Sequence, residues 1–201
     1  SDVCSSDLLN TTVPVTAVAL GKTYSFDPAQ AFAPITTVND TVSVLLANPA
    51  LGATTLAQAL ALAKSNPGGL SFGTPGVGST HHLAGEEMRL LSGARLVHVP
   101  YKTTPLLDVA AGVIPLAYSV VARGLPMVKS GKLRALAVLG DSRSSLLPDV
   151  PTVQEVLPGF EPPPAWTGLF APAGLPAPVL RRLHDDAVKD RKSTRLNSSH
   201  I

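Results

Sequence analysis

Phe72-Gly-Thr-Pro-Gly-Val-Gly-Ser-Thr-His-His-Leu-Ala-Gly-Glu86 is the stretch that decides the fold. A short apolar run ends at Phe72, a glycine-rich loop follows, and Ser79 or Thr80 then opens a helix-forming segment. Glycines let the backbone turn sharply and bring its N–H groups close to a ligand. The first turn of a helix adds unpaired donors and the positive end of the helix dipole. The pattern therefore predicts a strand–loop–helix site for an anion such as a carboxylate.

Two other interpretations of this loop stay open. The string Gly73-x-x-x-x-Gly78-Ser79-Thr80 approaches the phosphate-binding P-loop, but Ser79 stands where a lysine must reach the β- and γ-phosphates. Nucleotide hydrolysis is therefore disfavoured. The simpler alternative is a strand-to-helix turn whose glycines serve tight packing alone, and the loop by itself does not decide between this turn and an anion site.

The two ends of the chain read as sequencing-adapter sequence. Ser1-Asp-Val-Cys-Ser-Ser-Asp7 and Asp190-Arg-Lys-Ser-Thr-Arg-Leu-Asn-Ser-Ser-His200 can be encoded by DNA strings whose overlap is reverse-complementary. The two ends of a natural gene have no reason to be complementary. We therefore expect residues 1–8 and 190–201 to be adapter-derived and exclude them from the fold.

Composition narrows the class of function. The formal net charge of the chain is +2, which is too small to predict a nucleic-acid or membrane-surface partner. The single cysteine, Cys4, lies in the adapter-derived start, so the rest of the chain has none, as in many exported and many cytosolic proteins. No apolar run approaches the ~18 residues of a membrane helix.

Short β-type runs alternate with helical segments along the chain. Strands are predicted over residues 32–38, 42–47, 70–72, 95–99, 113–118, 133–139 and 166–170. Helices are predicted from a cap at residue 54 or 55 to residue 66, and over residues 80–91, 106–111, 121–129 and 178–188, with a short helical turn at 151–156. This alternation predicts a parallel α/β sheet. Ligands bind such sheets at the carboxyl ends of strands, which is where the glycine loop lies.

Ordered blocks of residues carry a family resemblance. They are Tyr24-Ser-Phe-Asp-Pro28, the glycine loop through Glu86, His98-Val-Pro-Tyr-Lys102, Leu147-Pro-Asp-Val-Pro-Thr-Val153 and Trp166-Thr-Gly-Leu-Phe-Ala-Pro-Ala-Gly174. In this order the chain resembles the substrate-binding proteins of tripartite tricarboxylate transporters, the Bug-type periplasmic receptors. The similarity covers residues 23–189.

The resemblance implies a type II periplasmic-binding-protein fold, an α/β fold whose two lobes close on a small carboxylate. Residues 9–45 are then a partial lobe 1, residues 46–165 a nearly complete lobe 2, and residues 166–189 the return to the truncated lobe 1. The family's first strand, its other ligand loop and an export signal are expected to precede residue 9. An isolated lobe holds one end of a ligand but does not enclose it.

The resemblance also assigns ligand binding by position. The residues that match the family's loop and the segment after the next strand are Thr74, Pro75, Gly76, Val77, Gly78, Ser79, His82, Tyr101 and Lys102. His82 has an alternative role in hydrogen-bonding the loop, His81 is expected to be exposed, and Arg123 is either a carboxylate partner or a solvated helix-end arginine. The family usually continues Tyr-Lys-Gly-x-Ala-Pro, whereas Tyr101-Lys-Thr-Thr-Pro-Leu-Leu-Asp108 is shorter and lacks the glycine. Sites within residues 103–108 therefore stay open.

The implied function is a periplasmic receptor that captures a small carboxylate and delivers it to the membrane permease subunits of a tripartite tricarboxylate-type transporter. The resemblance implies no cofactor, no metal, no nucleic acid, no membrane insertion and, for the complete protein, a monomer. A ligand-binding partner of a signalling receptor is the alternative, and the identity of the carboxylate stays open.

A serine hydrolase is the enzyme alternative to the receptor. Ser79, His82 and Glu86 suggest a catalytic set, but a triad needs its base held by a separate element. The chain has neither a Gly-x-Ser-x-Gly elbow nor a His-Glu-x-x-His zinc motif in this region. The expectation is therefore a receptor and not an enzyme.

Overall fold

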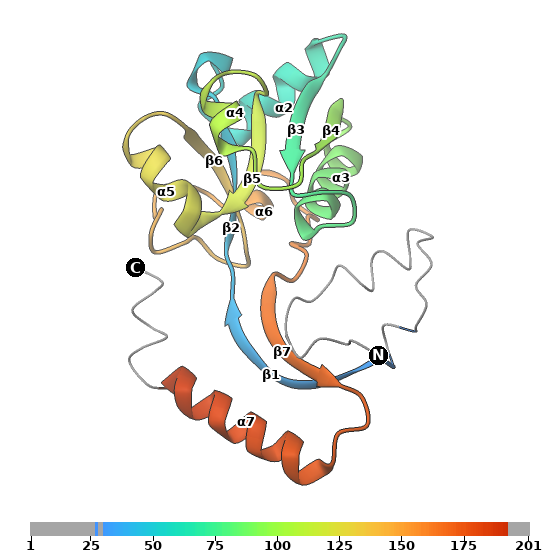
Figure 1. Ribbon diagram of the computed structural model, residues 1–201. Coiled ribbons are helices and arrows are strands. Elements are labelled where there is room, and N and C mark those ends of the chain that lie inside the picture. The colour runs from blue at the N-terminus through green and yellow to red at the C-terminus, as the bar shows by residue number, and fades with distance from the viewer. Residues whose placement is uncertain (1–26, 28–29, 193–201) are drawn as a thin grey trace. The chain divides into compact units, whose positions relative to one another are not determined.

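The computed structural model describes residue 27 and residues 30–192 of the chain. These residues divide into two compact units (Figure 1). Unit 1 takes its described residues from Ser1–Thr41 and Ala165–Ile201, and unit 2 is Val42–Pro164. Tyr24, residues 1–8 and residues 193–201 lie outside the described residues, so the assignment of the ends to adapter sequence stays a prediction. The predicted lobe boundaries likewise stay a prediction.

Unit 2 is built around a five-stranded sheet with the strand order β4-β3-β5-β2-β6. The strands are β2 (Ser43–Ala47), β3 (Leu70–Thr74), β4 (Leu96–Pro100), β5 (Leu116–Val120) and β6 (Arg134–Leu139). Strand β3 runs parallel to β4 and β5, whereas β2 runs antiparallel to β5 and β6. The sheet is therefore mixed, and the prediction of a parallel sheet is wrong for β2.

The direction of β2 follows from where its connections lie. Ala47, the last residue of β2, pairs with the first residues of β5 and β6, and Leu70, the first residue of β3, pairs with the first residue of β4. The chain thus leaves β2 and enters β3 at the same edge, through η1 (Pro49–Leu51) and α2 (Leu56–Ser65). Hydrophobic periodicity carries no information on strand direction, so the sequence alone does not report this reversal.

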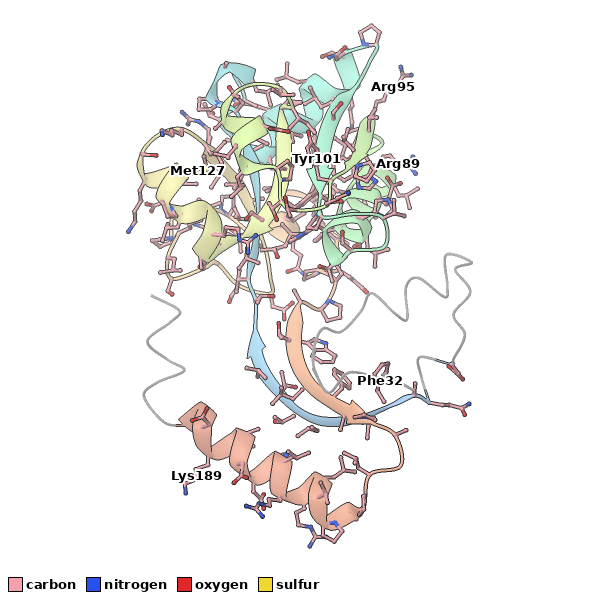
Figure 2. All side chains as sticks on the ribbon, in the orientation of Figure 1. Phe32, Arg89, Arg95, Tyr101, Met127 and Lys189 are labelled. Carbon is pink, nitrogen blue, oxygen red and sulfur yellow. The ribbon has the colours of Figure 1, made fainter. Side chains whose placement is uncertain are left out.

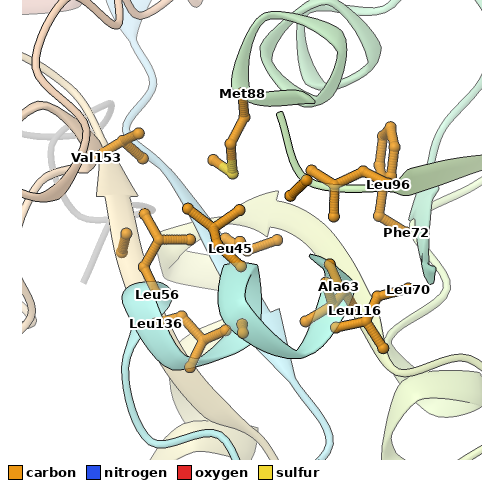
Figure 3. Close-up of a cluster of buried hydrophobic side chains, with 14 of the residues drawn as sticks. Leu45, Leu56, Ala63, Leu70, Phe72, Met88, Leu96, Leu116, Leu136 and Val153 are labelled. Atoms are coloured by element: carbon orange, nitrogen blue, oxygen red, sulfur yellow. The ribbon is translucent and has the colours of Figure 1, made fainter. Parts of the chain in front are cut away.

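Helices cover both faces of the sheet. The core on one face joins strand residues to α2, α3 (Thr80–Ser92) and α6 (Val153–Val156), as Leu56, Met88 and Val153 show in Figure 3. The core on the other face joins the sheet to α4 (Leu106–Ala110) and α5 (Val121–Lys129). Alternate residues of β2 enter the two cores, Leu45 one and Leu46 the other, because successive strand side chains point to opposite faces.

Side-chain caps mark the starts of three helices. Thr55 caps α2 where the sequence predicts it, Ser79 caps α3, and Thr152 and Glu155 form a capping box at α6. The predicted strand 113–118 is displaced, since β5 runs from Leu116 to Val120. Gly112 has φ +78°, and the turn that it opens delays the strand.

Unit 1 contains a two-stranded antiparallel sheet and one helix among its described residues. Strand β1 (Phe32–Asp40) pairs with β7 (Trp166–Pro172), and α7 (Ala177–Lys192) follows (Figure 1). His184 Nδ1 on α7 lies 2.8 Å from the carbonyl oxygen of Ile35 on β1. Within residues 30–192, no helix is long and apolar enough to cross a membrane.

Candidate ligand-binding site

The predicted ligand loop joins β3 to α3 at the edge of the sheet where the parallel strands end. Gly76 has φ +147° and Gly78 has φ +81°, backbone conformations that side-chain-bearing residues rarely adopt. Gly73 is required for packing instead, because a Cβ there would lie 2.5 Å from Pro105 Cγ. The packing alternative thus accounts for Gly73, whereas the other two glycines shape the loop.

Two hydroxyl groups fold the loop back on itself. Thr74, fully buried at the end of β3, accepts the Gly76 N–H with its Oγ1 at 3.2 Å. Ser79 Oγ donates to the Gly76 carbonyl oxygen at 2.8 Å and accepts the His82 N–H at 3.2 Å, which makes Ser79 the N-cap of α3. Pro75 and Gly76 are half-buried, Gly78 is buried, and Val77 at the tip is 51% exposed.

Three backbone N–H groups of the loop have no hydrogen-bond partner within the described part of the chain. They belong to Val77, Thr80 and His81. The Thr80 and His81 N–H groups lie in the first turn of α3, where helix donors point along the axis without an intrahelical acceptor. Donors of this kind, at the positive end of a helix dipole, suit an anion.

His82 bonds to the loop through its ring. The imidazole Nδ1 accepts the Gly78 N–H at 3.2 Å, and the ring lies 4.0 Å from the ring of His98, centroid to centroid. His98 Nε2 in turn lies 2.6 Å from Thr74 Oγ1. Burial, followed by the neighbouring His82, lowers the pKa of His98. The alternative role predicted for His82 is confirmed, and its ligand contact stays a prediction.

His81 is buried, so the prediction that it is exposed is wrong. Its side chain is 9% exposed, its Nε2 lies 2.9 Å from Ser43 Oγ, and its ring stacks on Tyr118 at 5.9 Å. Burial lowers the pKa of His81 to about 4. The buried residues of α3 are His81, Ala84, Gly85 and Met88. Their i, i+3, i+4, i+7 spacing is the helical core pattern, a signal that was present in the sequence.

Tyr101 lies beside the loop, because β3 and β4 end at the same edge (Figure 2). Its N–H donates to the Thr74 carbonyl oxygen at 2.9 Å. The side chain of Tyr101 is half-buried, and burial together with the Asp108 carboxylate raises its pKa. The Lys102 side chain is exposed, as is that of Arg123 on α5. The structure therefore brings the loop, His82 and Tyr101 together, with Lys102 next to them in the chain.

His98 stands in a block of the family resemblance, but the sequence alone assigns it no role in the site. The parallel pairing of β3 with β4 places His98 opposite Phe72, two residues before Thr74. Among the described residues, no group of three or more His, Cys, Asp or Glu side chains is arranged to hold a metal ion.

Comparison with known proteins decides the family. The profile of the tripartite tricarboxylate transporter family receptor matches residues 8–197. The chain belongs to this receptor family. A UPF0065 protein of Bordetella pertussis is 34% identical over 152 residues, which are 75% of this chain and 47% of that protein. BugT of the same organism is 34% identical over 150 residues, 73% of this chain and 46% of BugT. This family member thus spans about half the length of the curated relatives that it matches.

Solved structures of similar proteins share the fold. A periplasmic transporter superposes with a TM-score of 0.83 at 33% identity, covering 94% of this chain and 65% of that one. Rpa4515 of R. palustris, solved with adipate, gives 0.80 at 28% identity, covering 89% and 60%. MatC of Rhodopseudomonas palustris, solved with bound malate, gives 0.80 at 27% identity, covering 91% and 63%. The predicted type II periplasmic-binding-protein fold is confirmed.

Proposed function

We propose that the chain is the ligand-binding part of an extracytoplasmic receptor that captures a small carboxylate. Membership of the receptor family supports the role, and the relatives solved with adipate and malate support the ligand class. The observation that carries the proposal is the group of unpartnered N–H donors of Val77, Thr80 and His81 within the described loop. A bound carboxylate accepts hydrogen bonds from these donors, which are otherwise left to solvent.

The carboxylate is held mainly by backbone groups. Its oxygens accept the free N–H donors of the loop, and each charge-assisted bond of this kind contributes about 1.5–3 kcal/mol. The positive end of the α3 dipole adds to the attraction. Thr74, Pro75, Gly76, Gly78, Ser79 and His82 give the loop its shape, and Tyr101 forms the neighbouring wall. Lys102, exposed beside them, contributes a screened positive charge.

We propose the wider setting by analogy with the family. We place the protein in the periplasm, exported by a signal encoded upstream, and assign it the delivery of its ligand to the permease subunits of a tripartite tricarboxylate-type transporter. The complete receptor acts as a monomer that encloses the ligand between two lobes. Binding through amide donors requires neither a cofactor nor a metal.

The side-chain contacts of Ser79, His82 and Glu86 argue against the hydrolase alternative. Ser79 Oγ donates to a backbone carbonyl, the His82 ring accepts the Gly78 N–H, and the Glu86 carboxylate pairs with Arg89 at 2.8 Å. A nucleophile must instead share a hydrogen bond with its base. We expect no product burst from an activated ester; a burst abolished by Ser79→Ala would contradict the receptor proposal.

Calorimetric titration of the chain with malate and with adipate tests the proposal, with the uncharged diamides as negative controls. Gly76→Ala strains the loop at φ +147°, although its Cβ meets nothing closer than the Tyr101 carbonyl oxygen at 3.7 Å. Gly131→Ala is the matched control, since it strains the backbone at φ +71° beyond the end of α5 with no atom within 4 Å.

We expect at least one dicarboxylate to bind, and Gly76→Ala to weaken its binding by about tenfold because the loop donors are displaced. Gly131→Ala should lose stability and keep the affinity of the parent chain. The proposal fails if neither dicarboxylate binds, or if Gly76→Ala binds as tightly as Gly131→Ala.

A further inference from the structure

One buried hydroxyl group joins the ligand loop to the neighbouring strand. Thr74 is 0% exposed, and its Oγ1 lies 3.2 Å from both the N–H nitrogen and the carbonyl oxygen of Gly76. The same oxygen lies 2.6 Å from His98 Nε2 on β4. Buried polar atoms need their partners, so a change at His98 alters the bonds that the Thr74 hydroxyl offers to the loop.

His98 also contacts His82, the second side chain that holds the loop. Its ring packs at 4.0 Å against the ring of His82, whose Nδ1 accepts the Gly78 N–H. The centroid of the Phe72 ring lies 5.2 Å from that of His98. Phe72 is itself fixed against α3, because a Cβ added at Gly85 would lie 2.2 Å from it. His98 therefore contacts the packed core through Phe72 and also contacts both side chains that hold the loop, Thr74 and His82.

These bonds divide the loop amides into two sets. The Gly76 N–H is used by Thr74 and the Gly78 N–H by His82, whereas the Val77, Thr80 and His81 N–H groups have no partner among the described residues. The first set fixes the backbone, and the second set is left for a ligand. The His98 ring contacts the two side chains that hold the first set, Thr74 and His82.

We propose that His98 is a positioning residue of the ligand loop, which acts through Thr74 and His82 to direct the Val77, Thr80 and His81 N–H groups at a carboxylate. The inference rests on the proposed carboxylate-binding function and names the donors of that site. His98 itself makes no ligand contact in this account. Its imidazole supplies a hydrogen bond to Thr74 and a stacking surface to His82.

Three substitutions separate the two contributions of His98. His98→Phe keeps a stacking ring and removes the bond to Thr74, whereas His98→Gln keeps a polar group at the position of Nε2 and removes the ring. Thr74→Val removes the hydroxyl with little change of shape and tests the same bond if His98→Phe does not fold. His184→Phe, on α7 of unit 1, is the matched control for a histidine-to-phenylalanine change.

The first readout needs no ligand. Hydrogen exchange of the Gly76 amide in the full chain should become at least tenfold faster in His98→Phe and in Thr74→Val, because its acceptor is lost or displaced. His98→Gln should restore most of the protection, and His184→Phe should leave it unchanged. Equal Gly76 exchange in His98→Phe and the parent chain would overturn the proposal.

The second readout is the affinity for malate and adipate. His98→Phe and Thr74→Val should each weaken binding about tenfold, and the double variant should lose no more than either single one, since both remove one interaction. If the fold-losses of affinity of the two single variants multiply in the double variant, His98 does not act through Thr74. If the parent chain binds neither dicarboxylate, the proposed function fails, and the Gly76 exchange still decides whether His98 positions the loop.

Discussion

Neighbouring residues of the proposed ligand loop use different atoms to hold the loop and the core. His82 offers a ring nitrogen to the Gly78 N–H, whereas His81 turns its ring to Ser43 inside unit 2 and leaves its backbone N–H without a partner in the described chain. A buried imidazole without a carboxylate partner stays neutral, because burial disfavours the charged form. The residue whose backbone N–H is a proposed ligand donor therefore also ties α3 to the sheet through its side chain.

Burial of His81 makes the stability of unit 2 depend on pH. The folded chain holds the pKa of His81 at about 4, below its ordinary value. The unfolded chain therefore binds a proton that the folded chain excludes. The contribution of neutral His81 to the free energy of unfolding is fully present above about pH 6.5. It is lost as the pH falls towards that folded-state pKa. We expect His81 to contribute a loss of about 2 kcal/mol in the free energy of urea unfolding between about pH 7 and about pH 5. The lowered pKa of His98 adds to the loss in the parent chain and in a His81 variant alike.

His81→Gln is the control for that experiment. The amide side chain of this variant does not titrate, so its unfolding free energy should be lower near neutral pH and change less on acidification. The Glu155 carboxylate, whose pKa Arg143 lowers to about 2, titrates in a more acidic range. An identical loss between about pH 7 and about pH 5 in parent and variant would assign the effect to other groups.

The positive charge of Lys102 is expected to affect the affinity for malate. Lys102→Gln should weaken malate binding a few-fold at low ionic strength and make the affinity less sensitive to salt, because an exposed charge acts over about 10 Å at 0.1 M salt. Lys64→Gln, at the end of α2 before β3 begins, is the matched control. The measurement is calorimetry at two salt concentrations, and equal effects of the two substitutions would remove Lys102 from the site.

At the scale of elements, α3 is held at close range to β3 by a glycine. A Cβ at Gly85 would lie 2.2 Å from the Phe72 ring, whereas one at Gly68 meets nothing closer than 3.6 Å. Gly85→Ala should therefore destabilise unit 2 by about 1–3 kcal/mol, since the helix has to move away from the strand. Urea unfolding of Gly85→Ala and Gly68→Ala measures the difference, and equal midpoints would refute the close packing.

The elements were largely predictable from sequence because capping and turn residues mark their ends. Thr55, Ser79 and Gly93 bound α2 and α3 where local chemistry indicates. The direction of β2 was not predictable, because it depends on which edge its connection reaches. In the site, the loop glycines and the cap Ser79 follow from local pattern. The bond between Thr74 and His98 depends on the pairing of β3 with β4.

At the scale of the whole chain, the two units have unequal cores. Nearly all the buried hydrophobic residues in the described part of the chain belong to unit 2, whereas Val179 and Leu183 of α7 are more than 40% exposed. A two-stranded sheet is at best marginally stable by itself. We expect hydrogen exchange to show slow, cooperative protection of β2, β3 and β5 and fast exchange in β1 and β7. Equal protection of both sheets would contradict this division.

The amide nitrogen–proton spectrum of the chain, recorded as malate is added, tests the central claim most directly. The account predicts that the Val77, Thr80 and His81 amides shift most and saturably, while the Gly76 and Gly78 amides, bonded to Thr74 and His82, shift less. Absence of any shift in the loop, or larger shifts at residues away from the edge where β3 ends, would contradict it.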